Sequence, residues 1–412
     1  MLHFLILVAV AVVAVYFASR FVEGGSIRLI MAESSAVEYG YAKSVGSRAG
    51  SMRQLLNTYC PSLVDKRLAR MVPTPFLYTC MMQSLYSILC ARRRDGFSNI
   101  KYNRELFVLS DGGTVSLDWY PGPDSFGGKS TPIVVAMTGI AGGSKEYHVR
   151  CVAKRVACDR VMPCRFVCMN FRGCARTLLT NRRQNDAVNT SDYREVVNSI
   201  CERFPEAPVF GVGFSLGASL LTKYLGEEGD TCKLTAAIAI SCPFDLTVVR
   251  RMFNANTILN SYLFKPLIRR ALLRQFERNK DVILSGDQGF DADTIRNCQT
   301  MADVERIFIL KDAGFKTSDE YYNAACSANY IDRISVPYLS INSLDDQITP
   351  VQGIPFDKFK ANPNTVLALT EHGGHLGFLT GWQPRIWYLD TVAEFVALGA
   401  VAGRKALSCD YE

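Results

Sequence analysis

A glycine-flanked serine is the residue in this sequence with the clearest potential for nucleophilic chemistry. Ser215 lies in the run Gly213-Phe214-Ser215-Leu216-Gly217, between an apolar stretch at 208–213 and a helix-forming run that starts at Ala218. A sharp turn from a strand into a helix exposes a serine hydroxyl, and its crowded backbone requires glycines on both sides. Because a simple turn has the same pattern, the interpretation as a nucleophile depends on a base and an acid elsewhere in the chain.

The search for a base is short, because the chain contains four histidines: His3, His148, His372 and His375. His3 lies in an apolar N-terminal run, and His148 is interpreted as a surface or helix-start residue near the site. His372 and His375 follow an apolar stretch at 365–370, where a loop could carry an imidazole to the serine. We favour His375, because two preceding glycines let the loop fold back over the sheet edge. His372 is the alternative, and we expect it to be a loop or substrate contact.

The acid that orients the imidazole is expected in the pair Asp345-Asp346, directly after an apolar stretch at 337–342. Adjacent residues point in different directions, so one of the two carboxylates can hold the histidine. We favour Asp346, which stands four residues before Pro350 at the apex of the predicted turn, and we expect Asp345 to hydrogen-bond the loop. Asp345 as the acid stays open, as does the possibility that both residues cap a helix.

Acyl transfer also requires hydrogen-bond donors for the developing oxyanion. The small-residue loop 138–143 (TGIAGG) follows another apolar stretch and can turn a backbone N–H toward the serine. We therefore expect the backbone amides of Ile140 and Leu216, the residue after the serine, to form the oxyanion hole.

The composition gives no indication of a cofactor, a metal or a nucleic acid. The 14 cysteines are irregularly spaced without a C-x-x-C pair, and the chain lacks the glycine-rich signatures of nucleotide-binding loops. The net charge of +7 is concentrated near the N-terminus, where residues 1–100 hold 11 Lys and Arg against 5 Asp and Glu. Without a nucleic-acid-binding motif, this excess indicates either attraction to anionic lipid or an ordinary solvated surface.

Six near-continuous apolar runs predict strands that are buried on both faces. They lie at 133–138, 165–170, 208–213, 234–240, 337–342 and 365–370. Their alternation with helical segments predicts an α/β fold with a mostly parallel central sheet, covered by helices on both faces. Nearly a hundred residues separate the fourth run from the fifth, which predicts an inserted helical cap at about 244–333. Within it, 262–280 combines apolar and arginine residues, as expected for a helix that packs on the core or for a lid that touches a membrane.

The N-terminal run 2–22 is long and apolar enough to span a bilayer, and we interpret it as a retained anchor rather than a cleaved signal. Positive residues follow the run, which favours a single-pass protein, in the endoplasmic reticulum or a related internal membrane, with its catalytic domain on the cytoplasmic side. We expect a juxtamembrane and N-terminal helical segment at 23–100 and the main domain at 101–400.

The sequence resembles the membrane-associated, ABHD-type subfamily of α/β-hydrolase serine esterases and lipases over about residues 60–400. The resemblance rests on ordered blocks: 73–76 with Gln83, 109–113 with 117–119, 138–143 with Tyr147, 170–174, 213–217, 320–322, 345–346 and 372–378. The family's catalytic triad corresponds to Ser215, Asp346 and His375. The chain departs from the family at Thr138, where a histidine is usual, at Met81-Met82 and at Gln347, and none of these positions belongs to the triad.

The resemblance implies hydrolysis of carboxylic esters, such as acylglycerols, phospholipids or medium-chain acyl esters, without a cofactor or metal. The expected partners are therefore a lipid ester substrate and the membrane bilayer. Two alternatives remain: an alcohol O-acyltransferase that uses the same triad, and a catalytically silent lipid-binding hydrolase fold.

Overall fold

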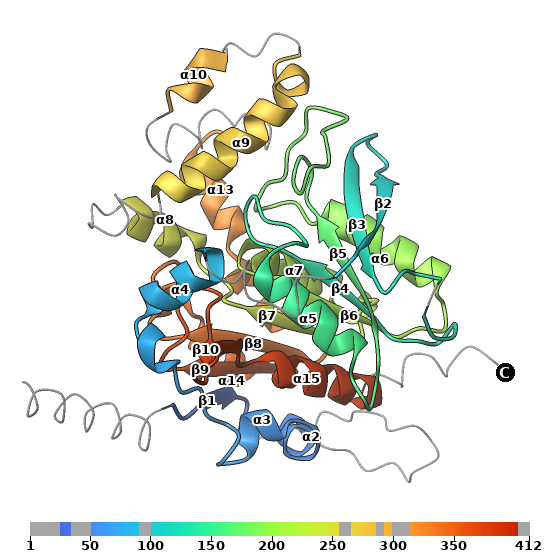
Figure 1. The fold of residues 1–412 in the computed structure, drawn as a ribbon, viewed down its shortest axis with the longest axis vertical. Helices are drawn as coiled ribbons and strands as arrows, with labels where there is room; N and C mark the ends of the chain where they lie inside the picture. The colour runs from blue at the N-terminus through green and yellow to red at the C-terminus, as the bar shows by residue number, and fades with distance from the viewer. Residues whose placement is uncertain are drawn as a thin grey trace, which may run out of the picture.

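The computed structural model describes residues 25–33, 51–89, 100–124, 126–254, 265–285, 292–298 and 314–402. A nine-stranded sheet with the order β1-β9-β8-β7-β6-β4-β5-β3-β2 runs through its centre (Figure 1). The strands are β1 (Arg28–Met31), β2 (Asn103–Val108), β3 (Thr114–Tyr120), β4 (Ile133–Met137), β5 (Arg165–Asn170), β6 (Val209–Phe214), β7 (Ala236–Ile240), β8 (Tyr338–Ser343) and β9 (Thr365–Thr370).

The six strands β4 to β9 form the parallel part of the sheet. All their residues are buried, because helices cover both faces, and this explains their near-continuous apolar sequence. Each strand predicted from the sequence begins and ends within two residues of one of these six. The predicted mostly parallel sheet is confirmed.

The three outer strands, which the sequence analysis did not identify, pair antiparallel. β3 pairs with β5 and β2 with β3 at one edge, and β1 pairs with β9 at the other. In β2, exposed and half-buried residues alternate, as expected for a strand with a solvated face. β1 lies within 23–100, where we expected a juxtamembrane and helical segment, and so that segment contributes a strand to the same sheet as the main domain.

Helices cover the sheet in two layers, each with its own hydrophobic core. One layer contains α2 (Met52–Tyr59), α3 (Pro61–Val64), α5 (Tyr147–Ala157) and α15 (Leu389–Ala402). The other contains α6 (Ser191–Arg203), α7 (Leu216–Glu228), α14 (Phe356–Ala361) and the short helix η5 (Ser327–Arg333).

Further helices lie between β7 and β8, within the range 244–333 where we predicted a cap. The described ones are α8 (Leu246–Asn254), α9 (Lys265–Ile283), α10 (Ala292–Arg296) and α13 (Ser318–Ala325). Figure 1 shows them grouped at one end of the molecule, beyond the sheet. The helix predicted at 262–280 corresponds to α9.

Within the residues that the structure describes, no helix combines the length and the apolar character that a membrane crossing requires. The predicted anchor at 2–22 falls outside these residues.

Candidate active site

Ser215 occupies the tight turn that joins β6 to α7. Its backbone has φ 53° and ψ −119°, a conformation that non-glycine residues rarely adopt. The flanking glycines are required by space, because a Cβ on Gly213 would lie 2.5 Å from Ala218 Cα and one on Gly217 would lie 2.6 Å from the Met137 carbonyl oxygen. The turn therefore holds the serine hydroxyl at the carboxyl end of the central strand.

The imidazole of His375 bridges this hydroxyl and a buried carboxylate. His375 Nε2 lies 2.8 Å from Ser215 Oγ, and its Nδ1 lies 2.9 Å from Asp346 Oδ2. His375 follows β9 and Asp346 follows β8, so neighbouring parallel strands deliver both groups to one edge of the sheet. In this arrangement Nδ1–H donates to Asp346, and Nε2 is free to accept the proton of the serine.

Asp346 is held in its charged form. Burial alone would raise the pKa of this carboxyl, but the positive field and hydrogen bond of His375, together with bonds from Thr349, outweigh it and hold the pKa below its ordinary value. The backbone amides of Ile348 and Thr349 donate to Oδ1 at 2.8 and 2.9 Å. The carboxylate can therefore stabilise an imidazolium without taking its proton.

The neighbouring carboxylate, Asp345, contacts the loop rather than the imidazole of His375. Its Oδ1 accepts from the Gly374 amide at 2.9 Å, and its Oδ2 lies 3.3 Å from His372 Nδ1. The ring of His372 in turn lies 4.8 Å from that of Tyr78. The two aspartates and two histidines thus form two separate pairs, one of which reaches Ser215.

The loop expected to supply an oxyanion donor passes directly beside the serine. A Cβ on Gly139 would lie 3.3 Å from Ser215 Cβ, and the Gly217 amide donates to the Thr138 carbonyl at 3.0 Å. Ile140 and Leu216 both border the same pocket as Ser215. The two residues whose amides are the candidate oxyanion donors therefore line the same pocket as the serine.

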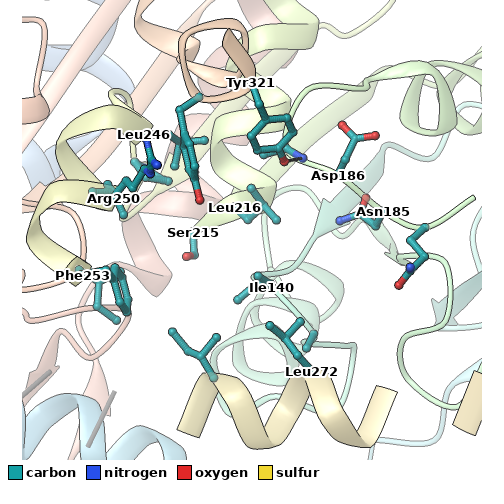
Figure 2. A pocket seen from close by; sticks show the side chains of 18 of the residues that line it. Ile140, Asn185, Asp186, Ser215, Leu216, Leu246, Arg250, Phe253, Leu272 and Tyr321 are labelled. Atoms are coloured by element: carbon teal, nitrogen blue, oxygen red, sulfur yellow. Dashed lines mark hydrogen bonds between the residues drawn. The ribbon is translucent and has the colours of Figure 1, made fainter. Parts of the chain in front are cut away.

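The pocket over the serine has a volume of about 200 Å³ and mostly apolar walls. Figure 2 shows Ser215, Leu216 and Ile140 near the middle of the lining, Leu246, Arg250 and Phe253 of α8 on the left, and Leu272 of α9 at the bottom of the view. Tyr321 of α13 and the loop residues Asn185 and Asp186 border the other side. The cap helices and the sheet thus form the pocket together.

A model of the family described as the alpha/beta hydrolase fold matches residues 132–381, which is more than half of the chain. The chain belongs to the α/β-hydrolase family. This hydrolase is 27% identical over 382 residues to phospholipase ABHD3 of Homo sapiens, and the alignment covers 90% of each of the two chains. The expected membership of the ABHD-type α/β-hydrolases is confirmed.

Two further relatives extend the comparison. The embryogenesis-associated protein EMB8 of Picea glauca is 32% identical over 289 residues, which is 68% of this chain, and the chain spans 62% of that protein. The medium-chain fatty acid ethyl ester synthase/esterase 2 of Saccharomyces cerevisiae is 28% identical over 407 aligned residues, covering 83% of this chain and 88% of that protein.

The contacts that hold the histidine loop of the hydrolase were not predicted from its sequence. Ser84, on α4 (Cys80–Leu89), accepts from the His375 amide at 3.1 Å, and the buried Gln83 accepts from the Leu379 amide at 2.8 Å. Ser241 Oγ accepts from the Leu376 amide at 3.2 Å. Gln83 belongs to one of the sequence blocks that resemble the family. That block was the feature from which a role of α4 at the site could have been inferred.

A buried polar cluster holds the loop 138–144 of the hydrolase. Asp118, on β3, accepts from Ser144 Oγ, from Asn170 Nδ2 at 2.9 Å and from two nitrogens of Arg104, each at 2.7 Å. The Ser144 amide also donates to Asn170 Oδ1 at 2.8 Å. Burial would raise the pKa of Asp118, but these hydrogen bonds and the charge of Arg104 lower it. A charged group on an outer strand thus fixes the loop that carries Ile140.

His148 is buried at the start of α5, which excludes the surface position that we considered. Its ring lies 4.7 Å from that of Phe214, directly before the nucleophile candidate. Burial, with a smaller contribution from His375, lowers its pKa to about 3. His148 is therefore neutral at physiological pH and packs behind the turn.

Proposed function

We propose that this protein is a serine hydrolase that cleaves carboxylic esters of lipids through an acyl-enzyme on Ser215. The observation that carries the proposal is the continuous chain of contacts from Ser215 Oγ through His375 to Asp346, at 2.8 and 2.9 Å. This is the geometry that general-base activation of a serine requires.

The first half of the reaction forms the acyl-enzyme. Ser215 Oγ attacks the ester carbonyl carbon while His375 Nε2 takes the hydroxyl proton, and Asp346 stabilises the imidazolium. The amides of Ile140 and Leu216 bind the negative oxygen of the tetrahedral intermediate. As the intermediate collapses, the C–O bond to the alcohol breaks and His375 returns the proton to the departing oxygen.

The second half releases the acid. Water replaces the alcohol, His375 removes one of its protons, and the hydroxide attacks the acyl carbonyl through a second oxyanion. The bond to Ser215 Oγ then breaks, and the proton on His375 passes to the serine. Every proton transfer uses the same imidazole, so the chain needs no further group for this chemistry.

A lipid ester suits the pocket better than a polar one. The walls contributed by α8 and α9 near Ser215 are mostly apolar and match an acyl chain. Relatives named as a phospholipase and as an esterase of medium-chain fatty acid ethyl esters support the same substrate class. We further propose that residues 2–22 anchor the protein as a single span, with the hydrolase domain on the cytoplasmic side.

The test is labelling with a fluorophosphonate probe, combined with hydrolysis of short p-nitrophenyl esters. Wild type should be labelled and active, whereas Ser215→Ala should lose labelling and at least about 10⁴-fold in rate. Ser219→Ala is the matched control, because Ser219 is buried in α7, the helix that follows Ser215, and should tolerate the change. Full activity in Ser215→Ala overturns the proposal, and a folded wild type without labelling or activity favours the silent lipid-binding alternative.

Acyl transfer to an alcohol is the second candidate function, because the yeast relative named as a synthase and esterase aligns with 83% of this chain. In that reaction an alcohol replaces water as the group that attacks the acyl-enzyme. Incubating the enzyme with an acyl ester and ethanol, and then measuring ethyl ester against free acid, separates the two functions. A product mixture that is independent of ethanol excludes transfer.

A further inference from the structure

The cap helix α9 has two chemically different sides. Ile268, Leu272 and Gln275 border the pocket above Ser215, and Phe276 is fully buried among the cap residues. Asn279, also buried, accepts from the Leu179 amide at 2.8 Å and so fixes the helix to the loop after β5. The inner side of α9 is therefore both a wall of the pocket and a packed surface.

The outer side of the same helix carries three exposed arginines, Arg270, Arg274 and Arg278. They are spaced four residues apart and so lie above one another on one face, and we call them the arginine ladder. Within the described part of the chain, none of the three forms an ion pair, whereas nearby Arg296 contacts Glu277 at 2.7 Å. Like charges at this spacing destabilise a helix, so the ladder is costly unless an anion neutralises it.

We propose that the arginine ladder binds the anionic headgroups of a bilayer and thereby holds the pocket against the membrane surface. The inference rests on the proposed lipid esterase function, because such a substrate must pass from a bilayer into the pocket. A planar array of headgroups can contact all three guanidinium groups at once, whereas a free phosphate contacts one or two. The same helix then presents its basic side to the lipid and its apolar side to the acyl chain.

The experiment uses the full chain in micelles of an uncharged detergent, with and without 20 mol% phosphatidylserine. The variant is the triple substitution Arg270→Gln, Arg274→Gln and Arg278→Gln, which keeps good helix formers. The control is Arg53→Gln, Arg67→Gln and Arg160→Gln, three exposed arginines outside the cap. The readouts are kcat/KM for micellar p-nitrophenyl octanoate, kcat/KM for soluble p-nitrophenyl acetate, and hydrogen exchange of α9.

In wild type and in the control, phosphatidylserine should raise kcat/KM for the octanoate ester by about 10- to 100-fold and slow exchange in α9. Salt at 0.5 M should remove both effects, because it screens the charges. The ladder variant should show neither effect, and its rate on the acetate ester should be unchanged.

Three outcomes overturn the inference: a full phosphatidylserine response in the ladder variant, an absent response in wild type, or an equal response to water-soluble glycerophosphoserine or heparin. The last outcome would indicate a soluble anion or polyanion as the partner. If wild type hydrolyses the acetate ester through Ser215 but ignores phosphatidylserine, the docking inference fails while the proposed esterase function stands.

Discussion

The base of the pocket and its cap are built in different ways. At the base, Ser215, His375 and Asp346 follow buried parallel strands, and contacts of 2.8 to 2.9 Å join them. The cap helices contribute apolar side chains to the pocket and leave charged residues such as Arg270 exposed. Under the proposed function, the base of the pocket would determine the reaction and the cap would determine which ester reaches it.

The largest expected effect comes from a substitution at the base of the pocket. Asp346→Asn should lower kcat on the order of 10⁴-fold, because the amide favours the wrong tautomer of His375. Asp345→Asn is the matched comparison and should cost far less, since Asp345 contacts Gly374 and His372 instead. Steady-state kinetics on a p-nitrophenyl ester measures both, and the reverse order of effects would identify Asp345 as the acid.

A smaller effect is expected from the hydrogen bonds that hold the base of the pocket in place from outside it. Ser144→Ala removes one hydrogen bond to buried Asp118 and should loosen the loop that carries Ile140. We expect kcat to fall about 10- to 100-fold, less than a complete loss of one oxyanion donor, with KM nearly constant. Ser110→Ala, at an exposed hydrogen bond to Glu195, is the control. An unchanged kcat would mean that the polar cluster does not position the loop.

The cap should respond through substrate choice rather than chemistry. Leu272→Trp adds volume to a pocket of about 200 Å³. We expect kcat/KM for p-nitrophenyl octanoate to fall about 10-fold while the acetate ester is hydrolysed at the normal rate, because an extra methylene is worth about 1–3 kcal/mol in such a pocket. Leu273→Trp, on the side of α9 that faces away from this pocket, should change neither rate. Equal losses on both esters would contradict this division of roles.

The smallest effect concerns the junction between the two regions. The carbonyl of Arg172 accepts from Gln275 of α9, and its guanidinium contacts Asp111 at 2.9 Å. Burial would raise the pKa of Asp111, but bonds from Arg172 and the Gly113 amide lower it from 3.8 to about 2. Because the folded-state pKa is lowered, Asp111 stabilises the fold above about pH 4, and this contribution disappears as the pH falls toward 2.

Denaturant unfolding of wild type and Asp111→Asn at several pH values checks this expectation. The variant should be less stable at pH 7, and the difference should shrink steadily below pH 4. A difference that is constant with pH would show that the charge of Asp111 is not its cause.

The sequence was sufficient to predict those features that burial or a crowded local backbone imposes on neighbouring residues. The strands β4 to β9 were predictable because burial on both faces leaves almost no polar residue in them. The turn at Ser215 was predictable because its crowded backbone demands glycine at 213 and 217. These signals lie within a few residues of the feature that they report.

The remaining features depend on contacts between distant parts of the chain. Ser84 lies 291 residues from the histidine whose amide it binds, and Asp118 lies 26 residues from Ser144. Gln83 and 117–119 belong to the family-like blocks of the sequence, but these blocks do not indicate which distant residue Ser84 or Asp118 contacts. The half-exposed strand β2 lacks the apolar run that revealed the central strands.

The pairing of β1 with β9 fixes the point at which the N-terminal segment joins the sheet. Arg28, the first residue of β1, is held at the sheet edge opposite Leu369. If residues 2–22 span a bilayer, five residues separate Val22 from this strand, and a fully extended chain from Val22 to Arg28 covers about 20 Å. So short a tether would confine the enzyme to lipids of the bilayer in which it is embedded and would keep it from neighbouring vesicles.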